Sequence, residues 1–105
     1  MSLTFIETSV FTKRIKEFMS DDNYRCLQAA LINDPELGDL IKGSGGLRKV
    51  RWGNEQKGKS GGVRVIYYLK LVDGKIFMLY VYAKNDQEEL TKEQLKILAK
   101  LRGAK

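Results

Sequence analysis

Cationic side chains that could bind and cleave a polyanion are concentrated in one part of this 105-residue sequence. Between Lys42 and Arg64 there are seven lysines or arginines against a single acid, Glu55, so this segment carries a charge of +6, equal to the net charge of the whole chain. Seven of the ten glycines also lie between Gly43 and Gly62. Because glycine lets the backbone bend and approach a ligand closely, this composition is typical of a polyanion-binding surface.

Strand-like alternation predicts how these cations are directed. In Leu47–Trp52, Val50 and Trp52 are expected in the core, which sends Lys49 and Arg51 to the opposite face. Neighbouring strands would then bring the cations together into a basic face without nearby carboxylates. Its expected members are Lys49, Arg51, Arg64 and Lys84, with Lys57 and Lys59 on a polar loop above them.

The cationic candidates differ in how strongly their surroundings indicate an anionic ligand. Lys57 and Lys59 are equally well explained as solvated charges, since exposed lysines are common. Arg64 lies between Val63 and Val65 in an otherwise apolar strand, so its guanidinium needs water or an anion. We interpret Arg64 as a phosphate ligand.

Tyrosines in these strands are more often core residues or cross-strand partners than platforms on which an RNA base stacks. Tyr82, near the end of its strand and beside Lys84, is the one that we consider as an RNA contact.

Several other chemistries are excluded or disfavoured. The chain has no histidine, which rules out Ser-His-Asp and Cys-His nucleophiles and any metal site built from histidines. The acids Asp86, Glu88 and Glu89 precede a predicted helix, where carboxylates favourably meet the helix dipole, so they are better explained structurally than as metal ligands. Residues 43–46 are not a phosphate-binding P-loop, because they are followed neither by a helix nor by the Lys-Ser or Lys-Thr pair that such a loop requires. We expect no metal and no cofactor.

A basic face of this kind can support RNA cleavage without a metal. Attack of a ribose 2′-hydroxyl on the adjacent phosphate needs a base, cations that stabilise the phosphorane, and an acid for the leaving 5′-oxygen. Neighbouring cations lower the pKa of a lysine, so that clustered lysines can supply the base, while arginine stabilises the phosphate. Composition alone leaves two alternatives open: a non-catalytic RNA- or ribosome-binding module, and an interaction protein whose basic groove receives an acidic partner.

The elements that must position these residues form an α+β fold in a single domain, residues 1–105. A short strand and two amphipathic helices come first, and an Asp-Gly turn joins the last two strands. Thr91 and Gln94 form a capping box for a short C-terminal helix. The apolar run Ile76–Ala83 is expected at the centre of the sheet. The prediction is a mainly antiparallel sheet of about four strands, Leu3–Glu7, Leu47–Trp52, Gly62–Leu71 and Ile76–Ala83, packed on a hairpin of helices that start near Thr8 or Ser9 and near Asp21 or Asp22.

The compartment is also indicated by the sequence. The longest apolar run is far shorter than the roughly 18 residues of a membrane span, and Cys26 is the only cysteine. We therefore expect a cytoplasmic protein without a membrane segment.

Three blocks of the sequence, GSGGLRKVRW, GKSGGVRVIYY and YAKNDQEELT, occur in this order and resemble the HigB type of toxin in the RelE superfamily, the toxic half of type II toxin–antitoxin pairs. The resemblance implies a small α+β domain and an endoribonuclease that enters the ribosomal A site and cuts mRNA during translation. It also implies neutralisation by a cognate antitoxin, which we expect to be a helix-turn-helix DNA-binding protein.

The resemblance extends to individual positions. Arg64 matches the strand arginine that contacts the scissile phosphate in the family, and Lys49 and Arg51 match its pair of basic strand residues. Lys84 matches the cation at the end of the last strand.

Lys57 and Lys59 lie on the loop that holds RNA in relatives, and they could contribute the base. The chain lacks the histidines of some HigB relatives and the tyrosine that some RelE relatives carry on the last helix. The resemblance therefore leaves the base and the acid unassigned.

Overall fold

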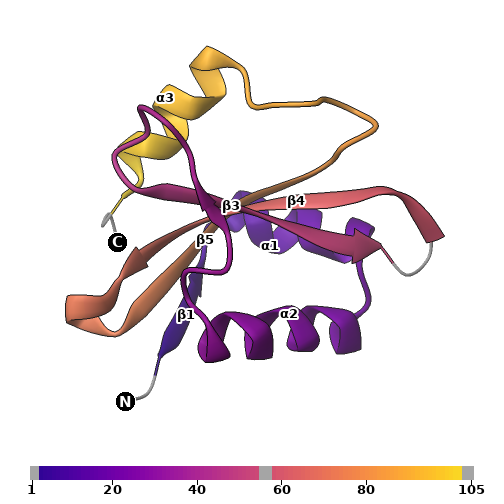
Figure 1. Ribbon diagram of the computed structural model, residues 1–105, viewed down its shortest axis with the longest axis horizontal. Coiled ribbons are helices and arrows are strands. Elements are labelled where there is room, and N and C mark those ends of the chain that lie inside the picture. The colour runs from indigo at the N-terminus through magenta and orange to yellow at the C-terminus, as the bar shows by residue number, and fades with distance from the viewer. Residues whose placement is uncertain (1–2, 55–57, 103–105) are drawn as a thin grey trace.

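A five-stranded mixed sheet lies between two layers of helices (Figure 1). The computed structural model describes residues 3–54 and 58–102, except the side chains of residues 54 and 58–61. The strand order is β1-β5-β4-β3-β2, in which β1 runs parallel to β5 and the other neighbours are antiparallel. The elements are β1 (Thr4–Glu7), α1 (Ser9–Phe18), α2 (Asp21–Asn33), β2 (Asp39–Leu40), β3 (Leu47–Asn54), β4 (Gly58–Lys70), the 3-10 helix η1 (Leu71–Asp73), β5 (Lys75–Ala83) and α3 (Lys92–Lys100).

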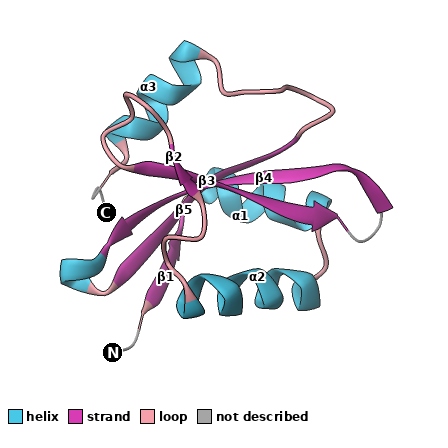
Figure 2. Cartoon of the chain, in the orientation of Figure 1, coloured by secondary structure: helices cyan, strands magenta, loops and turns pink. Residues whose placement is uncertain are grey.

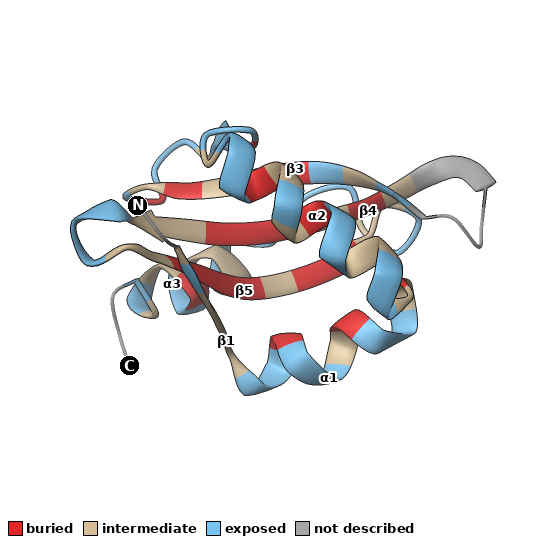
Figure 3. Cartoon of the chain, turned by 90° about the horizontal axis from the view of Figure 1, so that it is seen from below, coloured by how far each residue is buried: buried red, intermediate tan, exposed pale blue. Residues whose placement is uncertain are grey.

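The N-terminal helices α1 and α2 cover one face of the sheet (Figure 3). The hydroxyl of Thr8 caps α1 as expected. The cap of α2 is Ser20 and not Asp21 or Asp22; these two aspartates lie in the first turn, where their charge still meets the helix dipole. The buried residues of this layer are Phe11, Ile15, Met19, Leu27, Leu31, Val50, Val63, Val65, Tyr67, Ile76, Met78 and Val81.

The C-terminal helix α3 covers part of the other face (Figure 2). The predicted capping box is confirmed: the Thr91 side chain accepts the backbone N–H of Gln94, and the Gln94 side chain accepts that of Thr91, both at 3.0 Å. Leu90 and Leu95 both pack against the buried cluster of this layer. That cluster consists of Leu47, Ile66, Phe77, Leu79, Tyr82 and Leu98.

The apolar run expected at the centre of the sheet forms β5, which is an interior strand, but the middle strand of the five is β4. β5 lies between β1 and β4, and β1 pairs with only its first half. Beyond β1, α1 closes the open edge, because Thr8 Oγ1 donates to the carbonyl of Leu79 at 2.9 Å and Arg14 Nε donates to that of Val81 at 2.8 Å. The Arg14 guanidinium also lies 4.6 Å from the centre of the Tyr80 ring. The edge of β5 is therefore occupied by side chains.

The sheet differs from the prediction in two places. It has five strands and not about four, because two residues of the expected connection, Asp39 and Leu40, pair with β3 as β2. Such a short edge strand has no periodicity of its own, so only its partner reveals it. The loop expected over residues 53–61 is also shorter, since β3 extends to Asn54 and β4 begins at Gly58.

Tyr67 fixes the segment that leads into β2. Its buried hydroxyl donates to the carbonyl of Pro35 at 2.9 Å and accepts the N–H of Gly38 at 2.8 Å. A Cβ at Gly38 would lie 2.9 Å from the Lys49 backbone and from the Tyr67 ring, so a side chain there would displace the segment. Arg48 adds a hydrogen bond to the Gly38 carbonyl at 2.6 Å.

We expect Tyr67→Phe to destabilise the protein by about 1–3 kcal/mol, because it leaves two backbone groups of the 35–38 segment unpaired. Tyr82→Phe is the matched control: the Tyr82 hydroxyl is also buried but has no hydrogen-bond partner among the described residues, so its removal should be neutral or stabilising. Urea unfolding of the two variants measures both effects, and equal destabilisation would contradict the assigned hydrogen bonds.

Stability should also fall at alkaline pH because of Tyr24. Burial raises the pKa of Tyr24, and its hydrogen bond of 2.7 Å to the Glu7 carboxylate raises it further. The folded state then holds this proton to higher pH than the unfolded state, so the stabilisation is complete below about pH 10 and is lost as the pH rises above it. In urea unfolding across this range, Tyr24→Phe should lose less stability than the wild type; an unchanged decline would rule out this origin.

Candidate active site

The register of β3, β4 and β5 places three polar side chains in one row across the sheet. Arg51 lies opposite Arg64 in the β3–β4 pair, and Arg64 lies opposite Tyr82 in the β4–β5 pair. Residues that oppose each other in this way point to the same face, with Cβ atoms about 4.5–5.5 Å apart. Lys49, two residues before Arg51, joins them on that face. We call Lys49, Arg51, Arg64 and Tyr82 the basic row.

The residues next to Lys49 and Arg51 on β3 explain why these two cations point away from α1 and α2. Val50 is 4% exposed beneath α1 and α2, and Trp52 packs against the same cluster while its indole N–H donates to Asn23 at 3.0 Å. The predicted orientation of Lys49 and Arg51 is therefore confirmed.

Arg51 and Arg64 are direct cross-strand neighbours on β3 and β4. Arg51 is exposed and Arg64 is half-buried. Like charges directly opposite each other in a sheet are unfavourable, and an anion placed between them would reverse this effect. Since guanidinium groups bind phosphate in a bidentate manner, the row is suited to a phosphate with growing negative charge.

Lys84 stands at the end of β5, where the sequence places it. Its N–H donates to the carbonyl of Gly62 at 3.3 Å, which joins it to the strand that carries Arg64. Gly62 has a φ of 65°, and a Cβ at this position would lie 2.5 Å from the Trp52 carbonyl oxygen, so only glycine fits. Lys57 lies outside the described residues. Lys59 does not lie on a loop as expected, because its backbone belongs to β4; its side chain is not described.

A cleft of about 470 Å³ adjoins the basic row. Its wall combines apolar side chains with charges of both signs, so the expected absence of carboxylates is wrong. Asp39 pairs with Lys49 across β2 and β3, and Glu89 comes from the connection before α3. The lining residues are Asp39, Leu40, Ile41, Lys42, Lys49, Tyr82, Glu89, Leu90, Lys92 and Leu95.

Tyr82 belongs both to the row and to the cleft, but its side chain is 0% exposed. A base cannot stack on its ring in this arrangement, because both the ring and the hydroxyl of Tyr82 are buried. Burial raises the pKa of Tyr82; Arg64 lowers it, while Glu89 and Tyr80 raise it. The hydroxyl therefore stays a proton-bearing donor at neutral pH.

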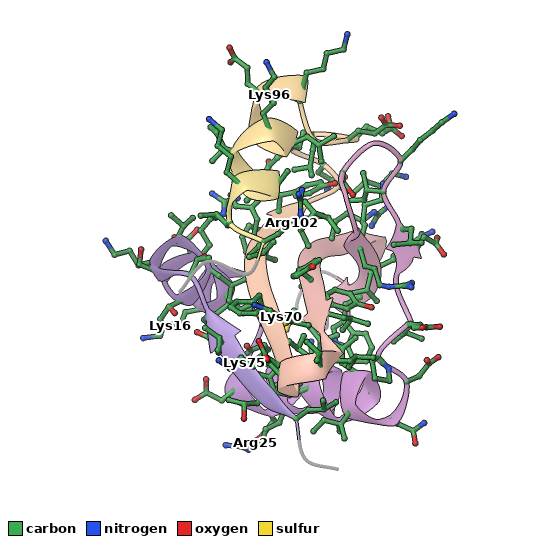
Figure 4. All side chains as sticks on the ribbon, turned by 90° about the vertical axis from the view of Figure 1, so that its left-hand side faces the viewer. Lys16, Arg25, Lys70, Lys75, Lys96 and Arg102 are labelled. Atoms are coloured by element: carbon green, nitrogen blue, oxygen red, sulfur yellow. The ribbon has the colours of Figure 1, made fainter. Side chains whose placement is uncertain are left out.

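Arg102, which follows α3 and is labelled in Figure 4, fixes the loop on one side of the cleft. It donates to the carbonyl of Ser44 at 2.8 Å, and the Ser44 hydroxyl accepts the N–H of Leu47 at 2.9 Å. This holds the loop that carries Lys42 against the end of α3. Sequence reasoning missed Lys42 and Lys92 as cleft residues, because only the folded chain brings these two segments together.

A second hollow, of about 210 Å³, lies between α1 and α3. Its lining residues are uncharged, so it is no site for a polyanion. They are Thr8, Val10, Leu79, Tyr80, Gln94, Ile97, Leu98 and Leu101.

Among the described residues, no three histidine, cysteine, aspartate or glutamate side chains lie close enough together to hold a metal ion. None of the helices in residues 3–54 and 58–102 combines the length and the apolar character that crossing a membrane requires.

Comparison with known proteins finds a matching family and similar solved structures. A model of the protein family described as the RelE toxin of the RelE/RelB toxin–antitoxin system matches residues 7–104. Among solved structures, the chain is similar to the E. coli toxin RelE in the free state, in a mutant with two arginines replaced by alanine. That similarity has a TM-score of 0.60 at 14% sequence identity and covers 84% of this chain and 90% of the other. At this identity the structural match shows the fold.

The paired guanidiniums predict a conflict between stability and function at Arg51. Arg51→Gln should stabilise the free protein by about a few tenths of a kcal/mol at low salt, because it removes a like charge opposite Arg64. The gain should shrink near 1 M salt, which screens the two charges. Thermal unfolding at the two salt concentrations measures this, and a loss of stability at low salt would show that the pair is not repulsive.

Proposed function

The chain belongs to the family of RelE toxins of RelE/RelB toxin–antitoxin systems, and from this premise we propose that it is an endoribonuclease that cuts mRNA on the ribosome. The observation that carries the proposal is the basic row, in which Arg51 and Arg64 oppose each other on one face and Lys49 lies beside them. This arrangement fits a phosphate that gains charge during reaction.

The reaction that we propose is an internal transfer. A base removes the proton of the ribose 2′-hydroxyl, and the 2′-oxygen forms a bond to phosphorus. The phosphorane then loses the 5′-oxygen, which takes up a proton, so the products are a 2′,3′-cyclic phosphate and a 5′-hydroxyl. No water and no oxidant enters this step.

The residues take the following roles in this proposal. Arg64 binds the scissile phosphate and, with Arg51, stabilises the phosphorane. Lys49 or Lys84 acts as the base or as a further stabilising charge. Arg51 also positions RNA, together with Lys57 and Lys59.

The biological setting follows from the family. Cutting of translated mRNA would stop translation and growth, and a cognate antitoxin would prevent this. We propose that the antitoxin is a helix-turn-helix DNA-binding protein, that the chain is of the HigB type, and that it acts in the cytoplasm, where ribosomes translate. The three sequence blocks from Gly43 to Thr91 support the HigB assignment.

The direct test is cleavage of mRNA on programmed ribosomes by purified protein. The wild type should cut, and Arg64→Ala should lower the rate by about 10²–10³-fold, because a charge-stabilising contact to the phosphate is lost. Arg25→Ala is the matched control: Arg25 is an exposed arginine on α2, bound to Asp22, and its loss should leave cleavage unchanged.

Two outcomes would overturn the proposal. Equal rates for the wild type and Arg64→Ala would remove the role of Arg64. Salt-dependent RNA binding with no cleavage, even with programmed ribosomes, would instead identify a non-catalytic RNA-binding module.

A further inference from the structure

Arg102 lies where the C-terminal end of α3 meets the loop between β2 and β3. The turn that closes α3 fixes its backbone, since its N–H donates to the carbonyl of Ala99 at 3.3 Å, and the neighbouring Leu101 packs against the buried cluster beneath the helix. Its guanidinium donates to the carbonyl of Ser44 at 2.8 Å. Arg102 therefore connects two segments that are 58 residues apart in the chain.

The loop is shaped to receive this guanidinium at Gly45. Gly45 has a φ of 75°, and a Cβ at this position would lie 2.6 Å from Nη1 and 2.7 Å from Cζ of Arg102. The guanidinium thus rests on bare backbone, where no side chain would fit. Gly43 offers a comparison within the same loop: its φ is 73°, but beyond its chain neighbours a Cβ there would have no described atom within 4 Å. The close approach is specific to Gly45.

Ser44 holds the loop together from the inside. Its hydroxyl donates to the carbonyl of Ile41 at 2.6 Å and accepts the N–H of Leu47 at 2.9 Å. These two hydrogen bonds stay within the loop and do not connect it to α3. Loss of the Arg102 contact should therefore release the loop from the helix as a unit, while the loop keeps its own turn.

The two segments that Arg102 joins form opposite parts of the cleft wall. Lys42 lines the cleft from the loop, and Lys92 lines it from the first turn of α3. Arg102 is not one of the lining residues, so it can act on a ligand only through the position of the walls. Lys49 belongs both to the lining and to the basic row. The position of the walls therefore affects how an RNA chain held at the row continues.

We propose that Arg102 is a positioning residue for RNA binding, which holds the loop of residues 41–46 against α3 and so keeps Lys42 and Lys92 in a fixed arrangement across the cleft. This inference rests on the proposed function, since RNA is the ligand. A binding site that is ordered before the ligand arrives avoids the entropy loss of ordering it during binding. Without Arg102 both lysines remain, but each binding event must order them. RNA binding should weaken, while the chemistry at Arg64 should stay the same.

The kinetic test compares Arg102→Ala with Lys100→Ala. Lys100 is an exposed cation in the last turn of α3, so its loss removes the same charge without the contact to Gly45. On programmed ribosomes, Arg102→Ala should raise KM about tenfold and leave kcat within about twofold, and Lys100→Ala should leave both within about twofold. Arg102→Lys should restore only part of the loss, because an ammonium group can donate to the Ser44 carbonyl but lacks the planar group that rests on Gly45.

Two glycine variants separate the contact from the charge of Arg102. Gly45→Ala and Gly43→Ala impose nearly the same backbone strain, but Gly45→Ala alone of the two places a methyl group against the guanidinium. Gly45→Ala should therefore raise KM as Arg102→Ala does, although it keeps every charge, and Gly43→Ala should raise it much less. In the double variant Gly45→Ala/Arg102→Ala the two effects should not add, because both changes break the same contact.

Binding of a short single-stranded RNA, followed by fluorescence anisotropy, gives a readout that needs no cleavage. Arg102→Ala and Gly45→Ala should weaken this binding by about tenfold, and Lys100→Ala and Gly43→Ala should leave it nearly unchanged. If the wild type binds RNA but does not cut mRNA on the ribosome, the proposed function fails and these affinities alone decide the role of Arg102.

Three results would overturn the positioning role. The first is a lower melting temperature for Arg102→Ala with wild-type KM and RNA affinity, which would make the contact merely structural. The second is an equal rise of KM in Arg102→Ala and Lys100→Ala, or in Gly45→Ala and Gly43→Ala, which would assign the effect to charge or to strain. The third is a wild type that binds no RNA at all.

Discussion

The register of β3, β4 and β5 is the constraint on which the rest of the site depends. It sets Arg51 opposite Arg64 and Arg64 opposite Tyr82, so that three strands contribute to one row. A slip by one residue would turn the whole row toward α1 and α2. The register is held because both faces of β4 and β5 are packed, by the N-terminal helices on one side and by α3 on the other. The core that stabilises the fold therefore also determines which face of the sheet carries the cationic side chains.

The site itself contributes little stability and relies on contacts elsewhere. Arg51 and Arg64 place like charges opposite each other across β3 and β4. The buried Tyr82 hydroxyl has no hydrogen-bond partner among the described residues, which is unfavourable in the free protein. Hydrogen bonds around the site compensate: Tyr67 fixes the segment before β2, and Arg102 fixes the loop before β3. Binding sites often contain polar or charged groups that lack a partner until a ligand binds, even where the rest of the sequence agrees with the fold.

Local patterns in the sequence predicted most of the fold. Periodicity identified the helices and four of the strands, the Thr91 capping box was correct, and alternation in β3 gave the direction of Lys49 and Arg51. What the sequence could not predict depends on contacts between distant segments. β2 exists only through its pairing with β3, and the carboxylates of Asp39 and Glu89 reach the cleft only after folding. The burial of Tyr82 likewise depends on how α3 packs.

The central claim is that the basic row promotes attack by the ribose 2′-hydroxyl on the adjacent phosphate. The most direct measurement is cleavage on programmed ribosomes of an mRNA with a single 2′-deoxy nucleotide at the cut, together with analysis of the ends formed from the unmodified mRNA. The account predicts that the deoxy site stays intact and that the normal site yields a 2′,3′-cyclic phosphate and a 5′-hydroxyl. Cleavage at the deoxy site, or a 5′-phosphate at the normal site, would contradict it.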